Sequence, residues 1–108
     1  MNDIQEGTGN IYADLGVPDA DEMLVKAQLA AAIGDILRAK RLTQQRAAEI
    51  LGLPQPKLSN LLNGHFRGIS ESKMIDCLTR LGRDIRIVVG PDRPRRRQPG
   101  RIEVLREA

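Results

Sequence analysis

Two short helical patterns separated by a glycine lie at the centre of this sequence, and they limit its possible folds more than any other feature. The first pattern covers residues 44–51, where small and apolar side chains recur at helical spacing. Thr43 precedes it and can accept a hydrogen bond from an N–H of the first turn. Gly52 follows it, and glycine adopts the left-handed conformation that ends many helices at little cost. A short helix over residues 44–51 is therefore expected.

The second pattern begins after this glycine. Pro54 and Pro56 cannot lie deep within a helix, although either can occupy a first turn. We therefore expect a helix over residues 55–62, which would bury a leucine face (Leu58, Leu61 and Leu62) and close at Asn63-Gly64. Two short helices joined by a glycine turn form a helix-turn-helix, which crosses its helices steeply and offers the second to the DNA major groove.

If the leucines are buried, polar residues remain on the outward face and at the N-terminal end of the second helix: Gln55, Pro56, Lys57, Ser59 and Asn60. Gln and Asn can form paired hydrogen bonds with adenine, Lys can contact guanine or phosphate, and Ser can bond to several bases. We predict that these residues contact DNA, together with Thr43, Gln44, Asn63 and Arg67. The alternative is a helical hairpin whose polar residues are only solvated, and a solvated loop explains Arg67 equally well.

Two further helical patterns flank this motif. The longer one covers residues 19–40, and its apolar stripe consists of Leu29, Ile33, Ile36 and Leu37. The other covers residues 70–81 and repeats Met74, Cys77, Leu78 and Leu81 at helical spacing. We interpret Cys77 as a small core residue rather than a reactive thiol. The flanking patterns thus add helices, and the whole predicts a mainly α fold.

The periodicity changes after the last helical pattern. Ile85, Ile87 and Val89 alternate with Arg86 and Val88, which predicts a β-strand with one buried face. A single strand has no partner within a helical domain, so it either lies alone against the helices or pairs with another chain. Antiparallel pairing with its own copy would give a symmetric dimer through Ile85, Ile87 and Val89.

At the helix-turn-helix residues, T-Q-Q-R-A-A-E-I-L-G and Q-P-K-L-S-N-L-L-N-G, the sequence resembles the lambda-repressor-like, or Xre, family. With G-N-I-Y-A-D-L-G before them and L-G-R-D-I-R-I-V-V after them, residues 7–90 are similar to its HigA-like antitoxins. The resemblance implies a helix-turn-helix domain of four to five helices with a C-terminal strand. It also implies a homodimer that binds double-stranded operator DNA, represses its own operon and neutralises a RelE/HigB-like mRNA-cleaving toxin. A stand-alone Xre-family regulator without a toxin is the alternative.

Charge divides the chain into an acidic front and a basic back. Positions 1–36 hold seven acidic residues and one basic residue, and the remaining positions hold 16 basic and seven acidic residues. This asymmetry favours two partners of opposite character. We expect a flexible acidic arm over residues 1–18, a DNA-binding domain over residues 19–90, and a basic, disordered tail over residues 91–108.

Within the arm, Ile11, Tyr12 and Leu15 form a small apolar group in acidic surroundings. This group either lies on the surface of the domain itself or docks onto a partner. Under the antitoxin resemblance, that partner is the toxin.

Enzymatic chemistry is not indicated by this sequence. One histidine and one cysteine, without clustered carboxylates beside them, provide neither a nucleophile with its base nor a metal site. We therefore expect no catalytic residue, metal or cofactor. A lone cysteine excludes an internal disulfide, and no apolar run approaches the roughly 20 residues of a membrane helix. These features predict a soluble, cytoplasmic protein.

Overall fold

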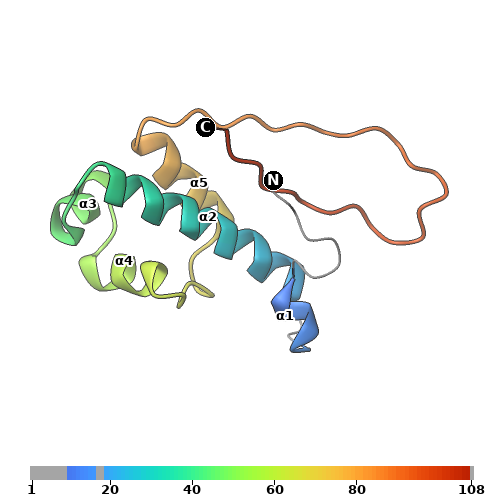
Figure 1. Cartoon of the computed structure of the whole chain (residues 1–108), viewed down its shortest axis with the longest axis horizontal. Helices are drawn as coiled ribbons and strands as arrows, with labels where there is room; N and C mark the ends of the chain where they lie inside the picture. Colours follow the sequence, from blue (N-terminus) through green and yellow to red (C-terminus); the bar gives the residue numbers. More distant parts are fainter. Residues whose placement is uncertain (1–9, 17–18, 108) are drawn as a thin grey trace.

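A computed structural model of the chain describes residues 10–16 and 19–107. Five helices are present in that part: α1 (Ile11–Asp14), α2 (Ala20–Ala39), α3 (Gln44–Leu51), α4 (Gln55–Leu62) and α5 (Glu71–Arg80). The long helix α2 forms the centre, with α3 and α4 on one side of it and α5 packed along it (Figure 1). The mainly α prediction is confirmed. None of these five helices has the length and apolar content that crossing a bilayer requires.

The helix-turn-helix has the bounds that its sequence predicts. The Thr43 hydroxyl accepts a hydrogen bond of 3.1 Å from the Arg46 N–H and so caps α3. Gly52 ends α3 with φ of 68°, in the left-handed region where a side chain would be strained. Pro54 stands directly before α4, and Pro56 lies in its first turn, where no donor is lost.

The hydrophobic core lies where α2, α3, α4 and α5 meet. Its most deeply buried large side chains come from all four helices: Ile33, Leu51, Leu58, Leu61, Met74 and Cys77. Burial raises the pKa of the Cys77 thiol, which disfavours the reactive thiolate. The core therefore uses Cys77 as a small apolar residue, as the helical spacing predicts.

The β-strand predicted over residues 85–89 is wrong for the single chain. No strand occurs in the described residues, and the alternation produces no buried face. Ile87, Val88 and Val89 are exposed by 82%, 85% and 91%, and Ile85 by 38%. The physical reason is that a strand needs a neighbour to pair its backbone N–H and C=O groups, and residues 10–16 and 19–107 supply none.

The segment after α5 forms a long loop that leaves the helices and returns to them (Figure 1). Near its two ends, Arg86 pairs with Glu107. Arg106 Nη1 also lies 3.0 Å from Asp35 Oδ2 on α2. Val104 is half-buried against the core. The returning limb of the loop is thus attached to α2.

Candidate nucleic-acid interface

Small residues let α3 and α4 approach closely. Ala47 is fully buried and Ala48 is 7% exposed. Leu53, in the turn, is buried and its N–H donates to the Ala48 carbonyl at 3.0 Å. Leu58 and Leu61 are buried on the inner side of α4, so the rotation of α4 about its own axis is set by packing. The opposite side of α4 must therefore face outwards.

Polar side chains occupy this outward side, as the leucine spacing predicts. Gln55, Pro56, Lys57 and Asn60 are exposed, while Ser59 is half-buried. Within the described part of the chain, the side chains of Gln55, Lys57 and Asn60 take part in no hydrogen bond or ion pair. They are therefore available to an external partner. Asn63 follows them, exposed, and its Nδ2 donates a long hydrogen bond of 3.4 Å to Ser59 Oγ.

The start of α3 contributes two more of the predicted contact residues. Thr43 and Gln44 are both exposed. The Thr43 oxygen is already an acceptor for the helix cap, but its hydroxyl hydrogen remains available to donate. Figure 1 shows α3 and α4 next to one another at one end of the molecule. The exposed residues Thr43 and Gln44 at the start of α3 and the exposed first turn of α4 therefore belong to the same helix-turn-helix surface.

Arg67, in the loop after α4, is held by contacts with α2 and with Asp19, the residue that precedes α2. Its main-chain carbonyl accepts a hydrogen bond of 2.8 Å from Lys26 Nζ, and its guanidinium pairs with Asp19. Lys26 is only 3% exposed and also lies 3.2 Å from Glu22 Oε2. Sequence reasoning missed this buried lysine, although its place four residues after Glu22 is the spacing of a helical ion pair. These contacts fasten the loop after α4 to α2.

The Arg67 guanidinium holds the pKa of the Asp19 carboxyl below its ordinary value, chiefly through their hydrogen bond. Partial desolvation opposes this shift, and the second oxygen, Oδ1, is buried without a partner in the described structure. Because the pKa of Asp19 is lower in the folded state than in the unfolded state, the ion pair raises the free energy of unfolding at pH values above the unfolded-state pKa. That stability disappears as the pH falls through the folded-state pKa.

We therefore expect Asp19→Asn to lower the melting temperature at pH 6 but to have a shrinking effect as the pH falls below about 4. Thermal unfolding of both proteins between pH 6 and pH 3 measures this. Asp92→Asn, on the exposed loop, is the matched control and should not change the melting temperature at pH 6. A constant difference between Asp19→Asn and the parent protein at every pH would show that the ion pair is not the cause.

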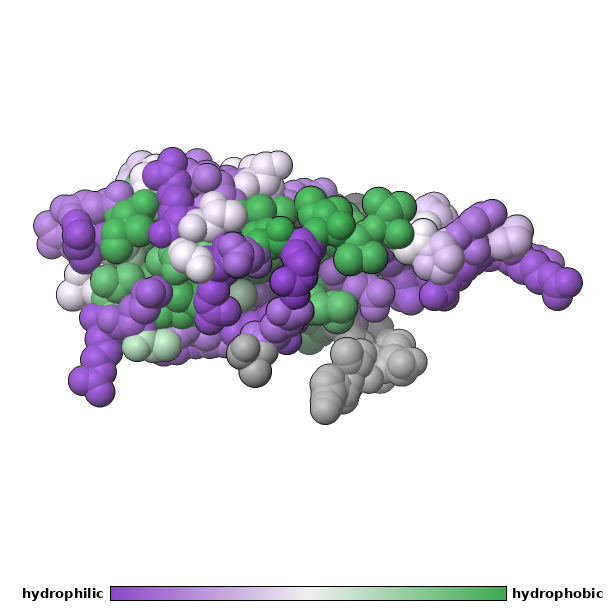
Figure 2. Space-filling model, turned by 90° about the horizontal axis from the view of Figure 1, so that it is seen from above, coloured by the Kyte–Doolittle hydropathy of each residue, from purple (hydrophilic) through white to green (hydrophobic). Residues whose placement is uncertain are grey.

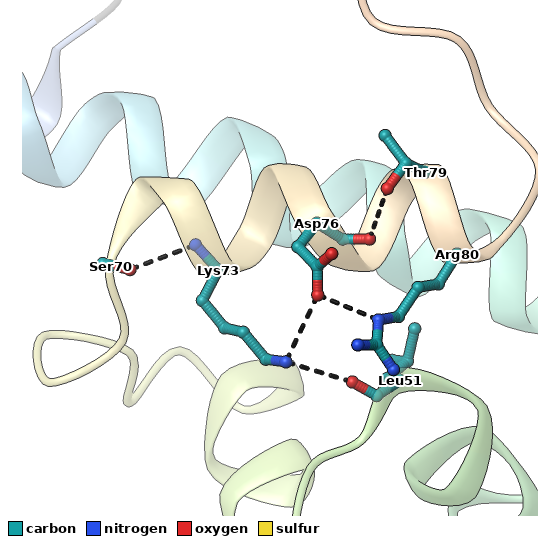
Figure 3. A network of polar contacts seen from close by, with 6 residues as sticks. All are labelled: Leu51, Ser70, Lys73, Asp76, Thr79 and Arg80. Carbon is teal, nitrogen blue, oxygen red and sulfur yellow. Dashed lines mark hydrogen bonds and ion pairs between the residues drawn. The ribbon is translucent and has the colours of Figure 1, made fainter.

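Side chains of α5 contact the end of α3, where the turn to α4 begins (Figure 3). Lys73 Nζ donates to the Leu51 carbonyl at 3.2 Å, at the C-terminal end of α3, where the helix dipole favours a cation. Asp76 Oδ2 accepts from Lys73 Nζ at 3.4 Å and from Arg80 Nε at 2.9 Å. Arg80 lies over Gly52, where an added Cβ would approach its Nη1 to 3.0 Å. The turn is thus held at Leu51 and covered at Gly52.

The apolar group predicted near the N-terminus is divided by the structure. Tyr12 is half-buried against the core, whereas Ile11 and Leu15 are exposed by 59% and 73%. Asn10 caps α1, and its Nδ2 donates to Asp21 Oδ1 at 3.1 Å and to the Ala20 carbonyl at 3.3 Å. The segment is therefore attached to α2 through Tyr12 and Asn10, and two apolar side chains face solvent. Residues 1–9 of the predicted acidic arm lie outside the described residues.

A second exposed apolar group lies on the C-terminal loop. Its members are Ile85, Ile87, Val88, Val89, Ile102 and Leu105. Figure 2 looks onto the side where this loop runs and shows apolar side chains gathered there, with a hydrophilic projection beyond them.

In residues 10–16 and 19–107, no three side chains that could bind a metal ion come together.

Comparisons with known proteins agree with this geometry. A family model described as a helix-turn-helix domain matches residues 11–90. A solved structure, titled as a member of the XRE family of transcriptional regulators, is 38% identical in sequence and has a TM-score of 0.73. The match covers 83% of this chain and 100% of that chain. No match was found among curated proteins.

Proposed function

The chain belongs to the XRE family of helix-turn-helix transcriptional regulators, and we propose that it is a repressor that reads operator DNA with α4. The observation that carries this proposal is the set of exposed side chains at Gln55, Lys57 and Asn60, which no described residue engages. In a motif whose second helix enters the major groove, side chains near its N-terminal end reach the base edges.

The proposed roles follow from the chemistry of each side chain. Gln55 and Asn60 would pair with adenine, and Lys57 would contact guanine or phosphate. Thr43, Gln44, Pro56, Ser59 and Asn63 would contact the sugar-phosphate backbone or pack against it and fix the register. Arg67 would reach phosphate only by exchanging its partner Asp19, so we assign it the smallest contribution.

Dimerisation is the second part of the proposal. Two half-sites on one face of B-DNA lie about 34–36 Å apart, and a monomer offers only one recognition helix. We propose that Ile85, Ile87 and Val89 pair with the same residues of a second copy. Their exposure, and the absence of backbone partners for them in the described single chain, support this surface.

Antitoxin activity is the third part, and it rests on the HigA-like resemblance of residues 7–90. We propose that Ile11, Tyr12 and Leu15 form the toxin-facing group of the acidic segment over residues 1–18, which is distinct from the reading face of α4 and from the basic tail over residues 91–108. A toxin that grips RNA needs a basic surface, which the acidic front would complement. The exposed Ile11 and Leu15 would supply apolar anchors.

A mobility-shift titration on a duplex from upstream of the gene for this protein tests the DNA-binding proposal. Unrelated duplex is added as competitor, and we expect the upstream duplex to be retained at a competitor excess of at least about 1,000-fold, the lower end of typical specificity. Equal competition by both duplexes would contradict sequence-specific repression. The antitoxin proposal does not depend on that result.

For the antitoxin part, we expect the double variant Ile11→Asp/Leu15→Asp to stay folded and bind DNA normally but to fail to protect cells that express the adjacent gene product. Both side chains are exposed, so the change costs the fold little, while charge would be buried at the toxin interface. Growth in co-expression measures protection. Ala13→Asp adds a carboxylate on the same short helix and should keep full protection. Full protection by the double variant would contradict a toxin-binding role for Ile11 and Leu15.

A further inference from the structure

The arginine-rich part of the C-terminal loop lies far from the helix-turn-helix. Figure 1 draws the longest axis of the molecule, 48 Å, horizontally, and α3 and the far end of this loop lie at its opposite ends. The loop also runs on the other side of α2 from α4 (Figure 1). The end of the loop therefore lies on a different side of the molecule from α4 (Figure 1).

The base of the loop is closed by contacts that do not involve its outer arginines. Arg86 pairs with Glu107, Arg106 pairs with Asp35, and Val104 packs against the core. Closing the loop at its base removes part of the conformational freedom that a free tail would lose on binding. The outer part of the loop is thus presented by the domain as a separate surface.

A turn gathers positive charge in this outer part. The Arg96 N–H donates to the Arg93 carbonyl at 2.9 Å, with Pro94 in the second position, where proline favours a turn. Five arginines lie between residues 91 and 101 with one carboxylate, Asp92: Arg93, Arg95, Arg96, Arg97 and Arg101. All five are exposed, and none has an ion-pair partner among the residues that the structure describes. We call this group the arginine tip.

We propose that the arginine tip binds the phosphate backbone of a second DNA duplex, so that the protein bridges the duplex held by α4 and another one. Guanidinium groups bind phosphate through paired hydrogen bonds, and closely spaced arginines match a polyanion with one charge per about 1.7 Å of duplex axis. Residues 91–101 contain no aromatic side chain on which an unpaired base could stack. This composition fits backbone binding to duplex DNA without base readout.

This inference rests on the proposed role of α4 only for the first duplex. The second contact is independent of sequence and has its own salt dependence. Each phosphate neutralised adds about 0.9 to the slope of log affinity against log salt concentration. Five arginines therefore contribute up to about 4.5 to that slope, which is enough to separate their effect from that of Lys57 alone.

The test uses the full chain in three forms: the parent, a variant with all five tip arginines changed to glutamine (R93Q/R95Q/R96Q/R97Q/R101Q), and one with all five changed to lysine. The upstream duplex is immobilised and loaded with protein, and capture of a fluorescent 30-base-pair duplex of unrelated sequence is measured. We expect the parent and the lysine variant to capture it. The glutamine variant should capture at least about tenfold less while binding the immobilised duplex within about twofold of the parent.

Three outcomes would overturn the bridging inference. Equal capture by the glutamine variant would show that the tip does not bind DNA. A matching loss of affinity for the immobilised duplex would place the tip on the same duplex as α4. If the parent instead binds poly-glutamate at the tip in preference to the unrelated duplex, the surface serves an acidic protein and the inference is also wrong.

A second measurement separates this inference from the proposed function. In the Gln55→Ala/Lys57→Ala/Asn60→Ala background, the salt slope for the unrelated duplex is measured with and without the five glutamine changes. We expect the five glutamine changes to lower this slope by about three to four, because the phosphate contacts of the arginine tip are lost. This expectation holds even if α4 recognises no operator. An unchanged slope overturns the inference whatever α4 does.

Discussion

Replacing Ile87 with aspartate is expected to leave a folded monomer that binds paired half-sites at least about 100-fold more weakly than the parent. Ile87 is 82% exposed in the single chain, so the change removes little from the core. In the proposed dimer the same carboxylate would be buried against the partner without a counter-charge. In a dimer, binding of the first recognition helix raises the effective concentration of the second, which increases the overall affinity by about 10²- to 10⁴-fold. A monomer loses this gain in affinity.

Val88→Asp is the matched control for that prediction. Val88 is 85% exposed and lies one residue further along, so it would point to the opposite side of an extended, paired segment. Sedimentation of both variants at several concentrations measures their oligomeric state. We expect Ile87→Asp to sediment as a monomer and Val88→Asp as a dimer. If both variants remain dimeric, the interface lies on the helices. If both become monomers, the alternate side chains Ile85, Ile87 and Val89 do not form a distinct dimer-facing side.

Asn60→Ala and Gln55→Ala are each expected to lose about 1–3 kcal/mol of discrimination between the operator and a mutated operator, a factor of roughly 5 to 150. An alanine there leaves the base edge without its paired hydrogen bonds. Lys57→Ala, if Lys57 meets phosphate, should weaken binding to all sequences alike and lower the salt slope by about one. Titrations of matched and mutated duplexes at several salt concentrations distinguish the two kinds of loss.

Glu49→Ala provides a control on the neighbouring helix. Glu49 is exposed on α3, and its one ion pair among the described residues is with Arg46, at 2.9 Å. Surface pairs of this kind contribute little to stability, so this variant should keep both its fold and its operator preference. A loss of preference in Glu49→Ala equal to that in Asn60→Ala would move the reading surface from α4 to α3.

The helix-turn-helix could be predicted from the sequence because its limits are local. Thr43 caps, Gly52 adopts a left-handed conformation, and Pro54 restricts the next start, and each acts on residues within one or two turns. The outward face of α4 followed from the positions of Leu58 and Leu61. Only Ser59 departs from it, because it is half-buried beside Asn63.

The strand was mispredicted because alternation describes side-chain spacing and says nothing about a hydrogen-bonding neighbour. Residues 85–89 have the spacing, but no described segment forms backbone ladder hydrogen bonds with them. The Lys26 bond to Arg67 and the Lys73 bond to Leu51 were missed for a related reason. Their partners lie 41 and 22 residues away along the chain, and no local pattern points to such distant contacts.

The most direct test of the account is the selection of binding sites from a pool of random duplexes by the parent and by Asn60→Ala. We predict that the parent selects two symmetric half-sites with centres about 34–36 Å apart, each containing an adenine that the variant no longer requires. The rest of the selected sequence should be the same for both proteins. Identical selected sequences from the two proteins would contradict the assignment of α4 as the reading helix.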